Sequence, residues 1–125
     1  LAPYCQFTCL ALETPRHVFV VCPTFSSLRA LAQRDLNADV DKILDDSHNV
    51  LPATLMDRLR LITRHLFSDD ARVWPQYSSH YYLGTVPPLP PSCAPLTQVT
   101  QIRIVSRVSA AWHIACIRLA GRIWG

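Results

Sequence analysis

The chain has 125 residues, enough for one small domain with a modest apolar core. Half of the residues are hydrophobic and 17% are charged, which excludes a disordered segment, because disorder needs low hydrophobicity and high net charge. The formal net charge of +3 is too small to establish a polyanionic partner, although Lys42 is the only lysine beside many arginines.

The composition also bears on the compartment. The first residues lack the order of basic, apolar and small residues that marks a secretory signal peptide. Arginines interrupt the most apolar stretch, 99–124, too often for it to cross a bilayer. The chain has five cysteines, and this odd number does not suit a secreted disulfide framework. We therefore expect an intracellular protein, nuclear or cytoplasmic, whose clustered thiols hold metal.

Three cysteines and a histidine gather in the first predicted unit, residues 1–23. Cys5, Cys9, His17 and Cys22 follow the order Cys-x3-Cys-x7-His-x4-Cys. Zinc in closed structural sites takes four tetrahedral sulfur or nitrogen ligands, and three cysteines with one histidine form a standard set. These four residues are the predicted ligands of one Zn²⁺ ion, with no position left open for a catalytic water.

A short helix is expected to carry the last two ligands. Thr14 can cap its beginning, Pro15 suits its first position, and Pro23 stops it directly after Cys22. The alternative is that the thiols are small buried hydrophobic groups and that His17 lies at the surface.

Residues 24–73 form the second predicted unit, a helical segment. A first helix is expected over 24–36 with Thr24 as its N-cap, and a shorter one over 38–44 before the polar turn 45–49. The third helix follows Pro52, whose missing N–H is harmless in an opening turn. Its apolar residues recur at helical spacing, at Leu55, Leu59, Ile62 and Leu66.

Residues 74–96 break this periodicity with prolines and aromatic side chains, which excludes a regular helix. We expect an ordered loop whose rings lie on the helical core. Residues 97–125 predict a C-terminal amphipathic helix from Thr97 to Trp124, with Gly121 weakening its last turn. The predicted fold is therefore mostly α, a short zinc knuckle followed by a small helical domain with a proline- and aromatic-rich loop.

Arginines of the C-terminal helix are predicted to form one stripe. At 100° per residue they fall within a sector of about 100°, and they are Arg103, Arg107, Arg118 and Arg122. Such a stripe can contact successive phosphates, which favours RNA or DNA as a partner. The alternative is an ordinary solvated face opposite an apolar one formed by Ile102, Val105, Val108, Trp112 and Ala115.

The N-terminal segment also resembles a known family. Residues 9–23, Cys-Leu-Ala-Leu-Glu-Thr-Pro-Arg-His-Val-Phe-Val-Val-Cys-Pro, resemble the cysteine-rich segment that follows the reverse transcriptase in many non-LTR retrotransposons. The shared features are a cysteine pair, a Glu-Thr-x-x-His step and a Cys-Pro that ends a short helix. The resemblance covers about residues 5–36, and the stretches 82–84 and 117–122 look loosely like fungal elements of this type. The gap between Cys5 and Cys9 is longer than the family's commoner two-residue gap.

This resemblance implies a C-terminal accessory region of a retroelement polyprotein that helps to hold RNA or target DNA. Arg16 and Arg29 lie close to the predicted knuckle, and we expect both to contact phosphates.

Catalysis is not expected of this chain. Phe67-Ser68-Asp69-Asp70 echoes the aromatic-x-Asp-Asp signature of reverse transcriptases, where carboxylates hold two metal ions. Here the four residues close an amphipathic helix, no apolar strands flank them, and the chain has no room for a polymerase palm. Any polymerase activity would lie in another part of the parent protein.

The sequence thus predicts a non-catalytic, zinc-binding module that associates with nucleic acid. Two alternatives stay open. The first is a helical protein-interaction domain or a degenerate remnant, whose nucleic-acid binding would be absent or would not depend on salt. The second is a helix over 97–124 that lies on a membrane surface and would bind liposomes.

Overall fold

The computed structural model describes residues 17–47, 50–68, 72–74 and 99–124. These ranges contain helices and turns and no strand, which confirms the predicted, mostly α fold class. In chain order the helices are the π-helix η1 (His17–Val21), the 3-10 helix η2 (Pro23–Phe25), α1 (Ser26–Asp45), α2 (Ala53–Arg64) and α4 (Val99–Trp124). Trp74 is the one described residue of the predicted loop 74–96.

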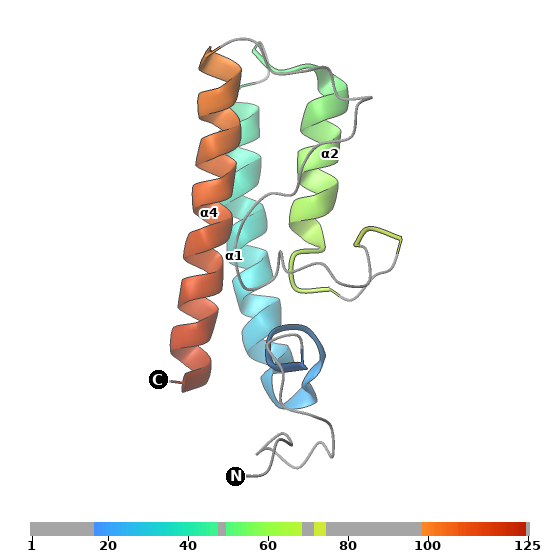
Figure 1. The fold of residues 1–125 in the computed structure, drawn as a ribbon, viewed down its shortest axis with the longest axis vertical. Coiled ribbons are helices and arrows are strands. Elements are labelled where there is room, and N and C mark those ends of the chain that lie inside the picture. Colours follow the sequence, from blue (N-terminus) through green and yellow to red (C-terminus); the bar gives the residue numbers. More distant parts are fainter. Residues whose placement is uncertain (1–16, 48–49, 69–71, 75–98, 125) are drawn as a thin grey trace.

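The three α-helices lie side by side, and α1 packs against both α4 and α2 (Figure 1). The short helices η1 and η2 lie at the end of the bundle where α1 begins and α4 ends (Figure 1). We call this part, residues 17–25, the knuckle end. The knuckle end lies beside the last turn of α4.

Helix α1 is longer than predicted, because the two helices expected over 24–36 and 38–44 are one. Leu36, Val40 and Leu44 are fully buried and recur every four residues, so one apolar stripe continues through the expected break. The range 26–45 contains no proline or glycine that would interrupt the helix. The predicted cap is also wrong, because Thr24 lies within η2 and Phe25 is the N-cap residue of α1.

Helix α2 begins and packs as its spacing predicts. Pro52 is its N-cap residue, and the helix buries Leu55, Leu59 and Ile62 against the core. Leu66 lies beyond the helix end, in a turn, and is still fully buried. The predicted stripe is therefore correct even where the helix does not extend to its last member.

Helix α4 has the predicted extent within the described residues, but it packs with a different face. Ile102 was expected in the core and is 46% exposed, whereas Ile104 is buried. Because apolar residues surround most of this helix, their period alone does not determine which of them face α1 and α2. The side chains that α4 buries are Ile104, Val108, Trp112, Ala115, Cys116 and Leu119.

Two tryptophans join the core. Trp112 of α4 is fully buried, and its indole N–H donates a 3.0 Å hydrogen bond to the hydroxyl of Thr63 on α2. The ring of Trp74 meets that of Trp112 edge-on, with centroids 6.0 Å apart, and its N–H donates to the carbonyl of His65. Trp74 therefore packs on the helical core, while the packing expected of the other loop aromatics stays a prediction. The rest of that loop lies outside the described residues.

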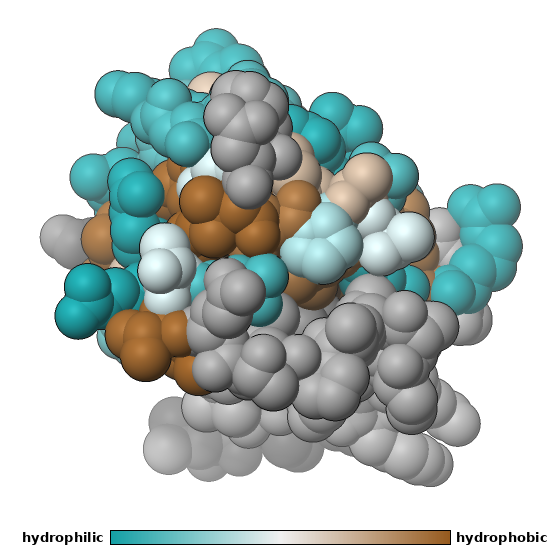
Figure 2. All heavy atoms as spheres, turned by 90° about the horizontal axis from the view of Figure 1, so that it is seen from above, coloured by the Kyte–Doolittle hydropathy of each residue, from teal (hydrophilic) through white to brown (hydrophobic). Residues whose placement is uncertain are grey.

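The surface is mixed in character. Seen from above, hydrophobic side chains gather near the middle of one end of the molecule, and hydrophilic ones surround them (Figure 2). Within the described ranges, no helix combines the length and the hydropathy that a membrane crossing requires.

Candidate functional site

Two of the four predicted zinc ligands lie in the described chain, and both are buried. His17 opens η1 and is 7% exposed, while Cys22 follows η1 and is fully buried. The backbone N–H of Cys22 donates a 2.6 Å hydrogen bond to the carbonyl of His17, which closes the single wide turn between them. Cys5 and Cys9 lie outside the described residues, among which no three metal-ligating side chains meet. The zinc site therefore stays a prediction.

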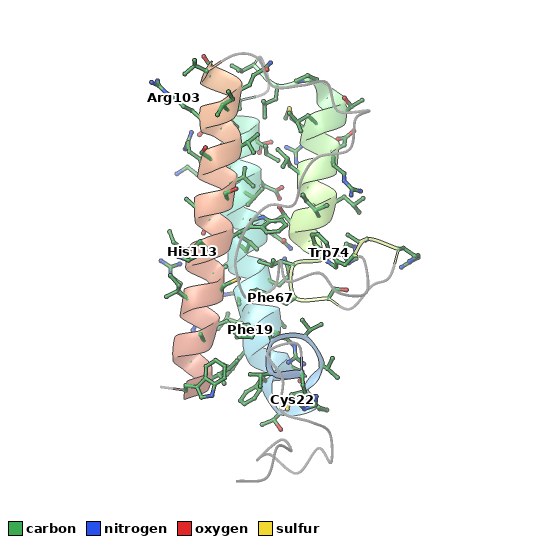
Figure 3. The ribbon with its side chains drawn as sticks, in the orientation of Figure 1. Phe19, Cys22, Phe67, Trp74, Arg103 and His113 are labelled. Atoms are coloured by element: carbon green, nitrogen blue, oxygen red, sulfur yellow. The ribbon has the colours of Figure 1, made fainter. Side chains whose placement is uncertain are left out.

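The surroundings of Cys22 connect the knuckle end to α4. Cys22 packs with Val18 and Phe25 in a small apolar cluster that Ile123 of α4 also contacts. Next to this cluster, the ring of Phe19 meets the ring of Trp124 edge-on at 5.8 Å between centroids. Figure 3 shows Phe19 and Cys22 at this end of the bundle. The knuckle end thus rests on the last turn of the helix that carries the arginine stripe.

Arg29 was expected to contact phosphate, but its guanidinium group turns back onto the knuckle end. It donates hydrogen bonds to the carbonyls of Cys22, at 2.7 Å, and Val18, at 3.4 Å. Burial lowers the pKa of Arg29, and the charge interaction with Cys22 opposes this shift. Arg29 therefore closes the carbonyl end of η1, a role in which basic side chains are common. The sequence does place Arg29 in the first turn of the helix that follows Cys22, and this nearness is the signal that could have suggested the contact.

The four arginines of the predicted stripe are spread along α4, and three of them, Arg107, Arg118 and Arg122, line hollows between α4 and α1. Arg103, Arg107, Arg118 and Arg122 are all exposed, and none forms an ion pair with another described residue. Figure 3 shows Arg103 projecting outward from the beginning of the helix. Helix α4 contains no acidic residue, so its own sequence does not neutralise them. Arg16, the remaining predicted contact, lies outside the described residues.

Arginines of α1 and α2, unlike those of α4, form ion pairs with acidic side chains. Arg60 on α2 bridges to Asp45 at 2.8 Å and to Asp41 at 3.4 Å on α1. Arg34 pairs with its neighbour Asp35 at 3.2 Å. Asp35, Asp41 and Asp45 of α1 thus meet arginines of α1 and α2. Asp39 instead lines the same hollows as Arg107, Arg118 and Arg122 of α4, without an ion pair to them in the described chain.

The aromatic-x-Asp-Asp stretch does not form a described site. Phe67 is buried in the apolar core at 7% exposure, which gives it a packing role. Asp69 and Asp70 lie outside the described residues. The expectation that this stretch is not catalytic therefore stays a prediction.

Comparison with known proteins does not test the resemblance of residues 9–23 to retroelement proteins, which stays a prediction. No protein-family model matches the chain, and neither a curated protein nor a solved structure does.

Proposed function

We propose that this chain is a non-catalytic, zinc-binding module that associates with RNA or DNA, from the C-terminal region of a reverse-transcriptase-like retroelement protein. One observation carries the nucleic-acid part. Helix α4 exposes four arginines and contains no acidic residue. The retroelement part rests on the sequence of residues 9–23.

The dimensions of the arginine stripe suit a phosphate backbone. Arg103 and Arg122 are separated by nineteen positions, or about 28 Å along a helix that rises about 1.5 Å per residue. Each guanidinium group can donate two parallel hydrogen bonds to one phosphate. The stripe would therefore reach several phosphates and release their counterions, which makes affinity depend on salt.

The zinc part is supported by the chemistry around His17 and Cys22. An imidazole and a thiolate are ligands that zinc prefers, and Cys5 and Cys9 would complete a closed structural set. The guanidinium group of Arg29 donates to the carbonyls of Val18 and Cys22 and so helps to fix the turn that joins the two predicted ligands. Zinc would stabilise the turn on which the last residues of α4 rest.

Salt-dependent binding tests the nucleic-acid part. Affinity of the full chain for a labelled RNA or DNA oligonucleotide is measured across a range of salt concentrations. We expect the slope of log K against log[salt] to fall by about one unit in magnitude for each of Arg107→Gln and Arg118→Gln. Arg34→Gln removes the same charge from an exposed position on α1 and serves as the matched control. Equal effects of all three substitutions, or affinity that ignores salt, would contradict the proposal.

Metal analysis tests the zinc part. The purified chain is expected to contain one zinc ion, measured by mass spectrometry, and Cys22→Ser and His17→Ala should each release it. Cys116→Ser is the matched control, because Cys116 is a buried cysteine of the core, 3% exposed and distant in sequence from the knuckle. If the zinc content of the Cys22 variant equalled that of the Cys116 variant, Cys22 would not be a ligand.

A further inference from the structure

A groove runs between α1 and α4. Its main hollow has a volume of about 420 Å³ and lies over Ile43 of α1 and Ala110, Ala111 and Ile114 of α4. A smaller hollow that shares Ala111 and Ile114 continues along the same two helices to Ala32 and Leu36. Because alanine side chains are small, the backbone of an occupant could approach this floor closely. Ile114, which lines both hollows, is 46% exposed and would be buried by an occupant.

The two edges of the groove differ in charge. The α4 edge carries Arg107, Arg118 and Arg122. The α1 edge carries Asp35 and Asp39, with Lys42 following toward the end of the helix. An occupant therefore meets positive charge on one side of an apolar floor and mainly negative charge on the other.

We infer that this groove binds an amphipathic helix of a partner protein that carries acidic residues along one edge and basic residues along the other. An apolar stripe on such a helix would cover Ile114 and the alanines, as in other helix-in-groove complexes. Its acidic edge would face the arginines of α4, and its basic edge would face Asp35 and Asp39. Charge complementarity of this kind sets the orientation of a bound partner.

A nucleic acid suits the groove less well than a protein helix does, although Arg107, Arg118 and Arg122 belong both to the groove edge and to the arginine stripe. Among the described residues, the floor offers aliphatic side chains and no aromatic ring on which a base could stack. The carboxylates of Asp35 and Asp39 on the α1 edge would repel phosphates. These two observations favour a protein helix as the occupant, independently of whether α4 also binds RNA or DNA.

The arginine spacing defines the partner further. Arg107 and Arg118 are eleven residues apart, about 16 Å along α4, so acidic groups about three turns apart on a packed helix would face both. A suitable probe is a fluorescein-labelled synthetic helix of about 18 residues, which spans this distance. It carries a leucine stripe, glutamates along one edge and lysines along the other. A second peptide, with the glutamates replaced by lysines, serves as its control.

Fluorescence anisotropy of the full chain with these peptides tests the inference without nucleic acid in the assay. We expect the glutamate-edged peptide to bind at least about tenfold more tightly than the control peptide, a difference of about 1.4 kcal/mol. Ile114→Ala should weaken that binding by about tenfold, because a central buried side chain is lost. Ile117→Ala, a matched change at an isoleucine that is 57% exposed on the same helix and outside the groove, should change it less than about twofold. Arg118→Glu should reverse the preference between the two peptides.

Absence of binding by the unmodified chain, equal binding of both peptides, or equal effects of the two isoleucine changes would overturn the inference. Loss of oligonucleotide binding in the Ile114 variant, with no peptide binding, would assign the groove to nucleic acid and also overturn it. Circular dichroism of each variant verifies that the fold is retained. Since the peptide assay contains no RNA or DNA, failure of the proposed function would leave its result unaffected.

Discussion

The helical bundle and the knuckle end are stabilised by different means. In the bundle, α1, α2 and α4 bury one large apolar cluster, which Phe19 of η1 also joins. At the knuckle end, Val18, Cys22 and Phe25 form a separate cluster of three buried residues. Burial of a large apolar surface can offset the entropy lost on ordering the bundle. The three side chains of the separate cluster, together with Phe19, offset much less of it for the turns of η1 and η2.

This difference shows where individual polar contacts matter most. The guanidinium group of Arg29 donates hydrogen bonds to the carbonyls of Val18 and Cys22. The ring of Phe19 contacts the ring of Trp124 edge-on. Each ordered residue costs about 1–2 kcal/mol in backbone entropy. A short segment with few apolar contacts therefore depends on such contacts, and on the proposed zinc ion, far more than the bundle does.

The largest effect is expected from Trp112→Ala in the bundle. This change removes a fully buried side chain and leaves a cavity, which costs about 3–5 kcal/mol in the free energy of unfolding. Chemical denaturation followed by circular dichroism measures the loss. Trp112→Phe keeps most of the volume but leaves the hydroxyl of Thr63 without its donor, so a smaller loss is expected. Equal losses for the two variants would mean that the hydrogen bond, and not packing, dominates.

A smaller and local effect is expected from Arg29→Met. The aliphatic chain is kept while two charge-assisted hydrogen bonds are lost, at a cost of about 1–2 kcal/mol. Amide hydrogen exchange should accelerate within His17–Val21 and remain slow in α2. Arg34→Met, at an exposed position of the same helix, controls for loss of charge. Faster exchange throughout the bundle would show that the two regions unfold together, which would contradict the claim that they are stabilised by different means.

The smallest effect is expected from Gly121→Ala, where α4 meets the knuckle end. A Cβ added at Gly121 would meet no atom within 4 Å, so the change adds helix propensity without a clash. We expect a gain of at most about 1 kcal/mol in the free energy of unfolding, and less if the last turn is frayed. Thermal and chemical denaturation measure it. A loss of stability would indicate that this turn moves closer to the knuckle in solution than the described contacts require.

The sequence predicts the fold well where one apolar face is distinct. The spacing of Leu55, Leu59 and Ile62 identifies α2 and its buried side. In α4 the helix is correctly predicted, but Ile102, expected on the apolar face, is exposed and Ile104 is buried, because apolar residues lie on several faces. The break expected near Asn37 is absent because the buried stripe of α1 continues past it. Which face is buried depends on the neighbouring helices, and local sequence does not contain that information.

The site is less predictable than the fold. The stripe on α4 follows from helical geometry alone, so the exposure of its arginines could be expected. The inward turn of Arg29 could not, because it depends on how η1 folds against the start of α1. The groove likewise depends on how α1 and α4 pack, since its two edges come from residues about seventy positions apart.

The order in which the helices appear along the chain has a consequence for folding. Helices α1 and α2 follow one another closely, whereas Trp112 reaches Thr63 across 49 residues of chain. A nascent chain synthesised as far as α2 therefore exposes the side of α1 that α4 later covers, and it leaves Thr63 without the indole of Trp112. Until α4 leaves the ribosome, this hairpin is a natural substrate for chaperones, and a truncated product that ends before α4 is expected to aggregate.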